Sequence, residues 1–253
     1  MRILILGGTS EARALAEALG PRAEFAVTVS LAGRTAEPLP QGAPVRRGGF
    51  GGAEGLARYV SDERVDVLID ATHPYAAAIS VNAAEAARET GVKLIALRRR
   101  PWPKVTGDNW VEVDSVVDAV RALGQASRRV FLALGRNELR PFASAPQHSY
   151  LIRSVDAVDP PLDLPHVTYL TARGPFSESE DCDLLTRHSI EVIVAKNSGG
   201  EATYGKIAAA RALQLRVIML KRPALPEVAS VASVEEALGV LDHALTLSMA
   251  RGV

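Results

Sequence analysis

The first thirteen residues constrain the fold most, because a short apolar segment, residues 3–6, runs directly into Gly7-Gly8 and then into an alanine- and leucine-rich segment. This pattern predicts a β-strand, a tight turn and an α-helix. The glycines let the backbone approach a ligand closely, and the start of a helix offers N–H groups to an anion. The third glycine of a complete G-x-G-x-x-G loop is missing, so an ordinary strand-to-helix turn capped by Thr9 or Ser10 is the alternative.

Apolar strands and alanine-rich helices alternate along the rest of the chain, which predicts parallel sheets with crossover helices. The order of elements repeats: residues 130–140 correspond to residues 3–13, and residues 191–196 correspond to residues 65–70. In both halves an apolar strand, a glycine turn and Glu-x-Arg predict the start of a helix. Two unrelated α/β halves would look alike at this level, so a true duplication is one of two interpretations.

We predict an α/β fold of two similar Rossmann-like domains with parallel sheets, residues 1–125 and residues 126–253. Each half is expected to close with a helix that begins at a serine, Ser115 in the first and Ser233 in the second. Ligands of parallel sheets bind beyond the carboxyl ends of the strands. The loops of both domains are therefore expected to face one interdomain cleft, with NADP bound by the first domain and substrate contacted by the second.

Composition excludes several classes of protein. Lysine plus arginine and aspartate plus glutamate both number 29, so the basic excess of a nucleic-acid binder is absent. No apolar run approaches the roughly 18 residues of a membrane helix, and the apolar run at the start is too short for a signal peptide. Cys182 is the single cysteine and the five histidines lack ligand spacing, so we expect no disulfide and no metal. A cytoplasmic location, without nucleic-acid or membrane partners, fits best.

The second predicted strand covers residues 25–31. The residues that follow it bear on the choice of cofactor. A protein specific for NAD usually carries an acidic residue there, which binds the adenosine ribose. This chain has Arg34 and Thr35 instead. A guanidinium with a neighbouring hydroxyl suits a 2′-phosphate, so NADPH is the expected cofactor. An exposed arginine without a role is the alternative.

Two further loops are candidates for the cofactor site. Gly49 and Phe50 lie in a glycine-rich loop, where the ring is placed to cover a base or a nicotinamide; a mobile surface turn explains the glycines nearly as well. Thr72 and His73 follow the apolar strand 65–70. His73 could donate a proton near neutral pH, although a structural histidine within the loop is an equal alternative.

Polar loops after strands in the second half are suited to a polyanionic substrate, because cationic side chains there could pair with carboxylates. The predicted substrate-binding residues are Arg136, Asn137, Lys196, Ser198, Gly199, Gly200, Tyr204 and Lys206. Lys206 does not belong to a Walker A loop, since the required glycine spacing and the following Ser or Thr are absent.

Five motifs occur in order along the chain: Gly7-Gly-Thr-Ser-Glu-Ala12, Gly48-Gly-Phe-Gly51, Asp70-Ala-Thr-His-Pro-Tyr-Ala76, Leu134-Gly-Arg-Asn137 and Lys196-Asn-Ser-Gly-Gly200. Together they resemble the precorrin-6A reductase family of cobalamin biosynthesis. The resemblance spans nearly the whole chain. It implies a two-domain oxidoreductase that uses NADPH to reduce one macrocycle double bond of precorrin-6A, giving precorrin-6B.

The resemblance and the loop chemistry together define the expected cofactor site, which consists of Gly7, Gly8, Thr9, Ser10, Glu11, Arg34, Thr35, Gly49, Phe50, Thr72 and His73. His73 or Lys196 is the candidate proton donor, and solvent is an equal contender. The expected partner is a tetrapyrrole, with transient contacts to neighbouring pathway enzymes.

Three alternatives stay open. A cobalt-containing precorrin-6A would be the substrate in the anaerobic pathway, and another small polyanion could replace the macrocycle. A two-domain protein that senses NADP without catalysis would keep the fold and lose the chemistry.

Overall fold

The computed structural model describes residues 1–33 and 37–251, and every strand pair in it is parallel. The strands form two six-stranded sheets. The first sheet has the order β12 (Ser230–Val231), β5 (Lys93–Leu97), β4 (Val67–Asp70), β1 (Arg2–Leu6), β2 (Ala26–Leu31) and β3 (Val45–Arg47).

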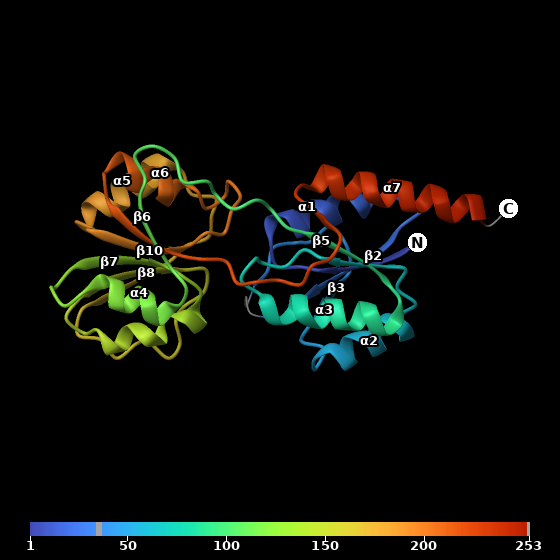
Figure 1. The fold of residues 1–253 in the computed structure, drawn as a ribbon, viewed down its shortest axis with the longest axis horizontal. Helices are drawn as coiled ribbons and strands as arrows, with labels where there is room; N and C mark the ends of the chain where they lie inside the picture. The colour runs from blue at the N-terminus through green and yellow to red at the C-terminus, as the bar shows by residue number, and fades with distance from the viewer. Residues whose placement is uncertain (34–36, 252–253) are drawn as a thin grey trace. The chain divides into compact units, whose positions relative to one another are not determined.

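Helices cover both faces of this first sheet. On one face α1 (Ser10–Leu19) and α7 (Val234–Arg251) lie side by side, and on the other α2 (Ala53–Asp62) packs against α3 (Ala77–Thr90) (Figure 1). Side chains of the central strand β1 alternate between two buried clusters. Ile3 and Ile5 contact the α1/α7 side, whereas Leu4 and Leu6 contact the α2/α3 side. This alternation is why a continuous apolar strand suits a sheet covered on both faces.

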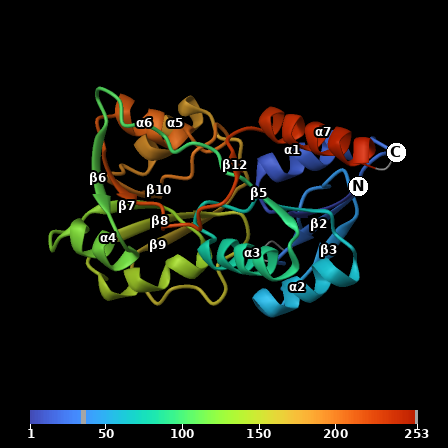
Figure 2. The same cartoon turned by 45° about the vertical axis from the view of Figure 1, so that its right-hand side comes forward.

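The second sheet has the order β6 (Asn109–Val113), β11 (Arg216–Leu220), β10 (Val192–Lys196), β7 (Arg129–Ala133), β8 (Ser149–Ser154) and β9 (Val167–Thr171). One face is covered by α5 (Glu178–Arg187) and α6 (Gly205–Ala212), and α4 (Val116–Leu123) contacts the short helix η2 (Arg140–Ser144) (Figure 2). The glycine turn after β7 leads into η1 (Arg136–Glu138) and η2, not into the predicted α-helix. Pro141 at the start of η2 lacks the N–H that a continuing helix would need.

Both sheets share one strand order, and each receives its sixth strand from the other half of the chain. After β5 the chain leaves the first sheet, and β6 pairs with β11 in the second; after β11 it returns, and β12 pairs with β5. The two compact units are therefore Met1–Arg100 with Pro223–Val253 (unit 1) and Pro101–Arg222 (unit 2).

This division corrects the predicted boundary after residue 125, which falls inside unit 2. The helices capped by Ser115 and Ser233 do exist, but each belongs to the other half from the one predicted. The α/β fold with two similar parallel sheets is confirmed. A cleft between the halves stays a prediction.

A buried histidine in unit 2 makes stability depend on pH. His148 is fully buried, and its Nδ1 atom has no hydrogen-bond partner among the described residues. Burial lowers the pKa of His148, the nearby carbonyl of Gly124 opposes this effect, and the charge of Arg128 lowers the pKa further. Below about pH 6.5 the unfolded chain takes up a proton that the folded protein does not, so acid destabilises the fold.

We therefore expect the free energy of unfolding to fall between about pH 7 and about pH 5, and to fall less in His148→Gln. Urea unfolding at the two pH values, followed by circular dichroism, measures the difference. His188→Gln, which changes a histidine at the end of α5, is the matched control. An equal pH dependence in wild type and His148→Gln would contradict this assignment.

Within the described part of the chain, none of the helices combines the length and apolar character needed to cross a bilayer. Among these same residues no group of three His, Cys, Asp or Glu is placed to hold a metal ion.

Candidate functional site

The turn between β1 and α1 has a backbone that favours glycine at two successive positions. Gly8 has φ +111°, a conformation that other residues rarely adopt, and a Cβ on Gly7 would lie 3.0 Å from Val29 Cγ1. Thr9 caps α1, because its Oγ1 accepts a hydrogen bond from Ala12 N at 3.1 Å. The first N–H groups of such a helix have no acceptor within the helix, so this turn can hold an anion.

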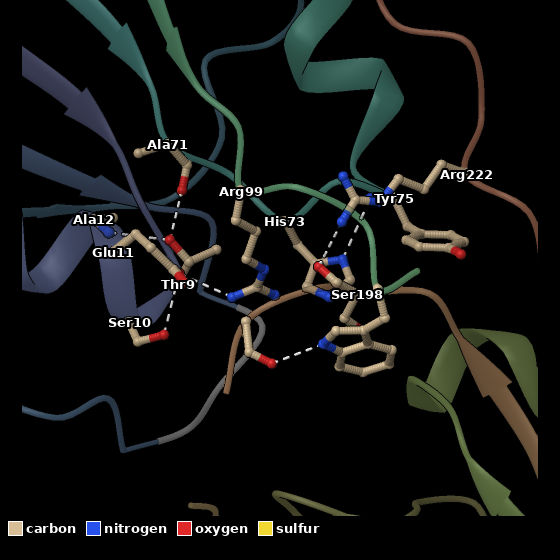
Figure 3. A network of polar contacts seen from close by, with 12 residues as sticks. Thr9, Ser10, Glu11, Ala12, Ala71, His73, Tyr75, Arg99, Ser198 and Arg222 are labelled. Carbon is tan, nitrogen blue, oxygen red and sulfur yellow. Dashed lines mark hydrogen bonds and ion pairs between the residues drawn. The ribbon is translucent and has the colours of Figure 1, made fainter. Parts of the chain in front are cut away.

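Thr9 also joins two loops at the carboxyl edge of the first sheet. Its Oγ1 donates to the carbonyl of Ala71 at 2.8 Å, which ties the turn after β1 to the loop after β4 (Figure 3). The chain proceeds from β1 toward β3 on one side and from β4 toward β12 on the other. The bond therefore lies at the topological switch point, where open α/β sheets bind their ligands.

Asp70 organises the loop after β4. Its side chain is buried, with one oxygen accepting from Thr72 Oγ1 and the other from Ser80 Oγ, both at 2.6 Å. Thr72 Oγ1 is thus engaged within the loop. His73 Nδ1 accepts from Tyr75 N at 3.3 Å, an arrangement that leaves the proton of a neutral ring on Nε2.

An ion pair lies beside this switch point. Arg99 Nη1 is 2.8 Å from Glu11 Oε2, and both side chains are largely buried, at 16% and 22% exposure. Thr9, Glu11, Thr72 and Arg99 line a small pocket together with Pro74 and Leu97. Arg99 offsets the negative charge of Glu11 in the first turn of α1, where an anionic ligand would otherwise be repelled.

Arg46 fixes the glycine-rich loop after β3. It donates to the carbonyls of Gly48 at 2.6 Å and Gly49 at 2.8 Å, and its guanidinium lies 3.8 Å from the centre of the Phe50 ring. Tyr59 packs edge-on against the same ring. One face of Phe50 is therefore already covered. Arg34 and Thr35 lie outside the described residues.

The corresponding edge of unit 2 carries a second ion pair. Lys196, the last residue of β10, lies 2.5 Å from Glu138 Oε1, and Glu138 Oε2 accepts from Gly135 N at 2.9 Å. The pair joins the loops after β7 and β10, the two strands at the switch point of the second sheet. In unit 1 the corresponding link between the two switch-point loops is the hydrogen bond from Thr9 to Ala71.

Other predicted substrate residues lie in the same two loops. Arg136 is 40% exposed and donates to the carbonyl of Ala157 at 3.2 Å, and Asn137 is exposed in η1. Ser198, Gly199 and Gly200 follow Lys196, and both glycines have positive φ, +68° and +75°. The chain therefore turns sharply directly after β10.

Tyr204 and Lys206 take part in contacts within unit 2. Arg211 Nη2 donates to the Tyr204 hydroxyl at 2.6 Å, and this bond and the bond to Asp108 raise the pKa of Arg211. Lys206 is 4% exposed, and its Nζ donates to the carbonyl of Thr203 at 2.5 Å and lies 4.9 Å from the centre of the Trp102 ring. These positions favour a structural role for both residues.

The sequence did not reveal which residues hold these loops in place. In the structure they are Arg46, Asp70, Ser80, Arg99, Trp102, Glu138, Asn197 and Arg222. Most of their partners are distant in sequence, and local patterns do not reveal such pairs. One signal was available: Glu138 occupies the place of Glu11 in the repeat, and acids at equivalent helix starts indicate a shared role.

Residues 2–242 match the family model described as precorrin-6x reductase CbiJ/CobK. A precorrin-6A reductase from Sinorhizobium sp. is 58% identical over 96% of this chain and 93% of its own length, and one from Rhodobacter capsulatus is 48% identical over 97% and 98%. The solved structure of CobK precorrin-6A reductase superposes with a TM-score of 0.92 at 47% identity, covering 96% of both chains. The chain belongs to the precorrin-6x reductase family, and it is an oxidoreductase.

Proposed function

We propose that this chain is an NADPH-dependent precorrin-6A reductase, which adds two hydrogens across one macrocycle double bond and gives precorrin-6B. The observation that carries the proposal is the 58% identity over 96% of the chain to a protein with that activity in its name. The metal-free substrate is favoured over the cobalt form. Relatives named precorrin-6A reductase are 42% to 58% identical, whereas those named cobalt-precorrin-6A reductase are 25% to 30% identical.

The cofactor is assigned to unit 1. The Gly7-Gly8 turn admits close approach of a diphosphate, and the strand order around β1 and β4 is that of dinucleotide-binding sheets. The carboxyl edge beside Thr9 and Thr72 would receive the nicotinamide half. When bound, NADPH supplies a hydride to an electrophilic carbon of the macrocycle.

The tetrapyrrole is assigned to the loops of unit 2. Precorrins carry many carboxylates, and charge-assisted hydrogen bonds from Arg136 and Lys196 would hold some of them. Ser198 and the two glycines after it offer a hydroxyl and backbone groups at the same edge. The protein's main task is to hold the macrocycle flat against the nicotinamide at reacting distance.

A proton must reach the carbon next to the one that accepts the hydride. Lys196 is our first candidate, because its ammonium lies at the switch point of unit 2 and is only 15% exposed. Glu138 holds it there at 2.5 Å. His73 is the second candidate, through its Nε2 proton.

Replacement of Arg34 tests the assignment of the 2′-phosphate. We expect Arg34→Ala to raise KM for NADPH by about tenfold to a hundredfold and to leave kcat at saturating NADPH nearly unchanged, because a ground-state contact to the phosphate is lost. KM for NADH should hardly change, so the preference for NADPH falls. Steady-state kinetics with both cofactors measure this. A loss of kcat at saturating NADPH would contradict this role.

The proposed function is tested with purified protein, NADPH and precorrin-6A. Oxidation of NADPH and the change in the visible band of the macrocycle should proceed together, faster than with NADH. A parallel assay with cobalt-precorrin-6A decides between the two substrates. Binding of NADPH without oxidation by either substrate would contradict the proposal and favour an NADP-sensing protein.

A further inference from the structure

The loop after β10, residues 197–200, contacts both segments through which the chain enters and leaves unit 2. Trp102 is the second residue of unit 2, and Arg222 is its last. Both make hydrogen bonds to this loop. The loop is thus bonded to two chain segments that are about 120 residues apart in the sequence.

Asn197 makes the contact with the entering segment. The residue is 8% exposed; its Oδ1 accepts from Trp102 N at 2.8 Å, and its Nδ2 donates to Trp102 O at 3.0 Å. One side chain thereby bonds both backbone groups of Trp102, as a neighbouring strand would. The indole Nε1 of Trp102 then donates to the carbonyl of Gly200 at 2.9 Å, which fixes the far end of the loop.

Arg222 makes the contact with the leaving segment. Its Nε donates to the carbonyl of Asn197 at 2.8 Å. Its Nη2 donates to the carbonyl of Ser198 at 2.9 Å, and both of these residues are labelled in Figure 3. Together with the Gly200 bond, three carbonyl oxygens of the loop are committed to donors within unit 2. A bound carboxylate would be repelled by free carbonyl oxygens and attracted by N–H and hydroxyl groups.

We propose that Asn197, held against Trp102, is a positioning residue for the tetrapyrrole. It holds the 197–200 loop in the shape that presents Ser198 and the glycine backbone to a substrate carboxylate. It does not touch the reacting atoms itself. This inference rests on the proposed function, which assigns the tetrapyrrole to this loop.

The test is Asn197→Ala, with the KM for each substrate measured separately. We expect KM for precorrin-6A to rise by about tenfold or more, equivalent to about 1.4 kcal/mol, while KM for NADPH stays the same. A merely structural role would reduce the fraction of active enzyme and leave both KM values unchanged. Lys221→Ala is the matched control, because Lys221 precedes Arg222 and pairs with the exposed Asp114 instead of the loop.

Trp102→Phe provides a milder variant, should Asn197→Ala fail to fold. It keeps the backbone groups that bond Asn197 and an aromatic ring beside Lys206 and Tyr204, and it removes the indole N–H that bonds Gly200, so a smaller rise in KM for precorrin-6A is expected. Titration of each variant with precorrin-6A in the absence of NADPH gives an independent readout of binding. Folded variants that bind precorrin-6A as tightly as wild type would overturn the positioning role. Wild-type protein that does not bind precorrin-6A at all would overturn the proposed function as well.

Discussion

Lys196→Ala is expected to lower kcat for precorrin-6A reduction by about a hundredfold to ten-thousandfold, the usual contribution of a positioned proton donor. KM for NADPH should not change, because Lys196 belongs to unit 2 and the cofactor is assigned to unit 1. Steady-state kinetics with each substrate varied in turn measure both effects. An unchanged kcat would mean that solvent or another residue supplies the proton.

One further variant separates the charge of Lys196 from its proton, and a second tests the rival donor. Lys196→Arg retains a cation for the carboxylates of the substrate, yet arginine does not release a proton in proteins. In this variant kcat should stay low, while KM for precorrin-6A should stay near the wild-type value. His73→Gln tests the rival donor and should leave kcat near the wild-type value. If His73→Gln abolishes turnover and Lys196→Arg does not, the two assignments must be exchanged.

The central strands of both sheets could be predicted because each leaves a strong local signal. The strand at 3–6 is a short apolar run that ends at a polar or glycine-bearing loop, and this signal recurs at 67–70, 130–133 and 192–196. Pairing partners leave no such signal. Asn109–Val113 could follow β5 in its own sheet or join another, and only the pairing of Trp110 with Val217 decides. The exchange of the sixth strands was therefore beyond local reasoning.

The candidate site was predictable to a similar extent. Loops at the carboxyl ends of parallel strands must lie at one edge of a sheet, so the glycine turn at Gly7 and the Thr72 loop could be placed together from sequence. The contacts that each side chain makes in the folded protein could not be predicted. Phe50 is covered on one face by Arg46, a near neighbour whose side-chain direction the sequence does not specify, and Lys206 is buried near Trp102, a residue that only the folded chain brings close.

The largest effect on stability is expected from Asp181, which forms a buried ion pair with Arg153. The Nη1–Oδ1 distance is 2.5 Å, and the side chains are 8% (Arg153) and 1% (Asp181) exposed. The guanidinium lies 3.7 Å from the centre of the Phe176 ring and 5.0 Å from that of Phe131. Loss of the carboxylate would leave the arginine charge among these rings without the buried acid that it pairs with, a change that costs about 3–5 kcal/mol in comparable pairs.

Asp181→Asn should therefore lower the free energy of unfolding by about 3–5 kcal/mol, measured by urea denaturation. Asp114→Asn, at an exposed pair with Lys221, is the control and should cost at most about 1 kcal/mol, because water screens that pair. The double variant Arg153→Met/Asp181→Leu should regain much of the loss, since the cost arises from an unbalanced buried charge and not from the missing pair itself. If the double variant is less stable than Asp181→Asn, then stacking of Arg153 on Phe176 contributes more than the ion pair does, and the destabilisation must be assigned to packing.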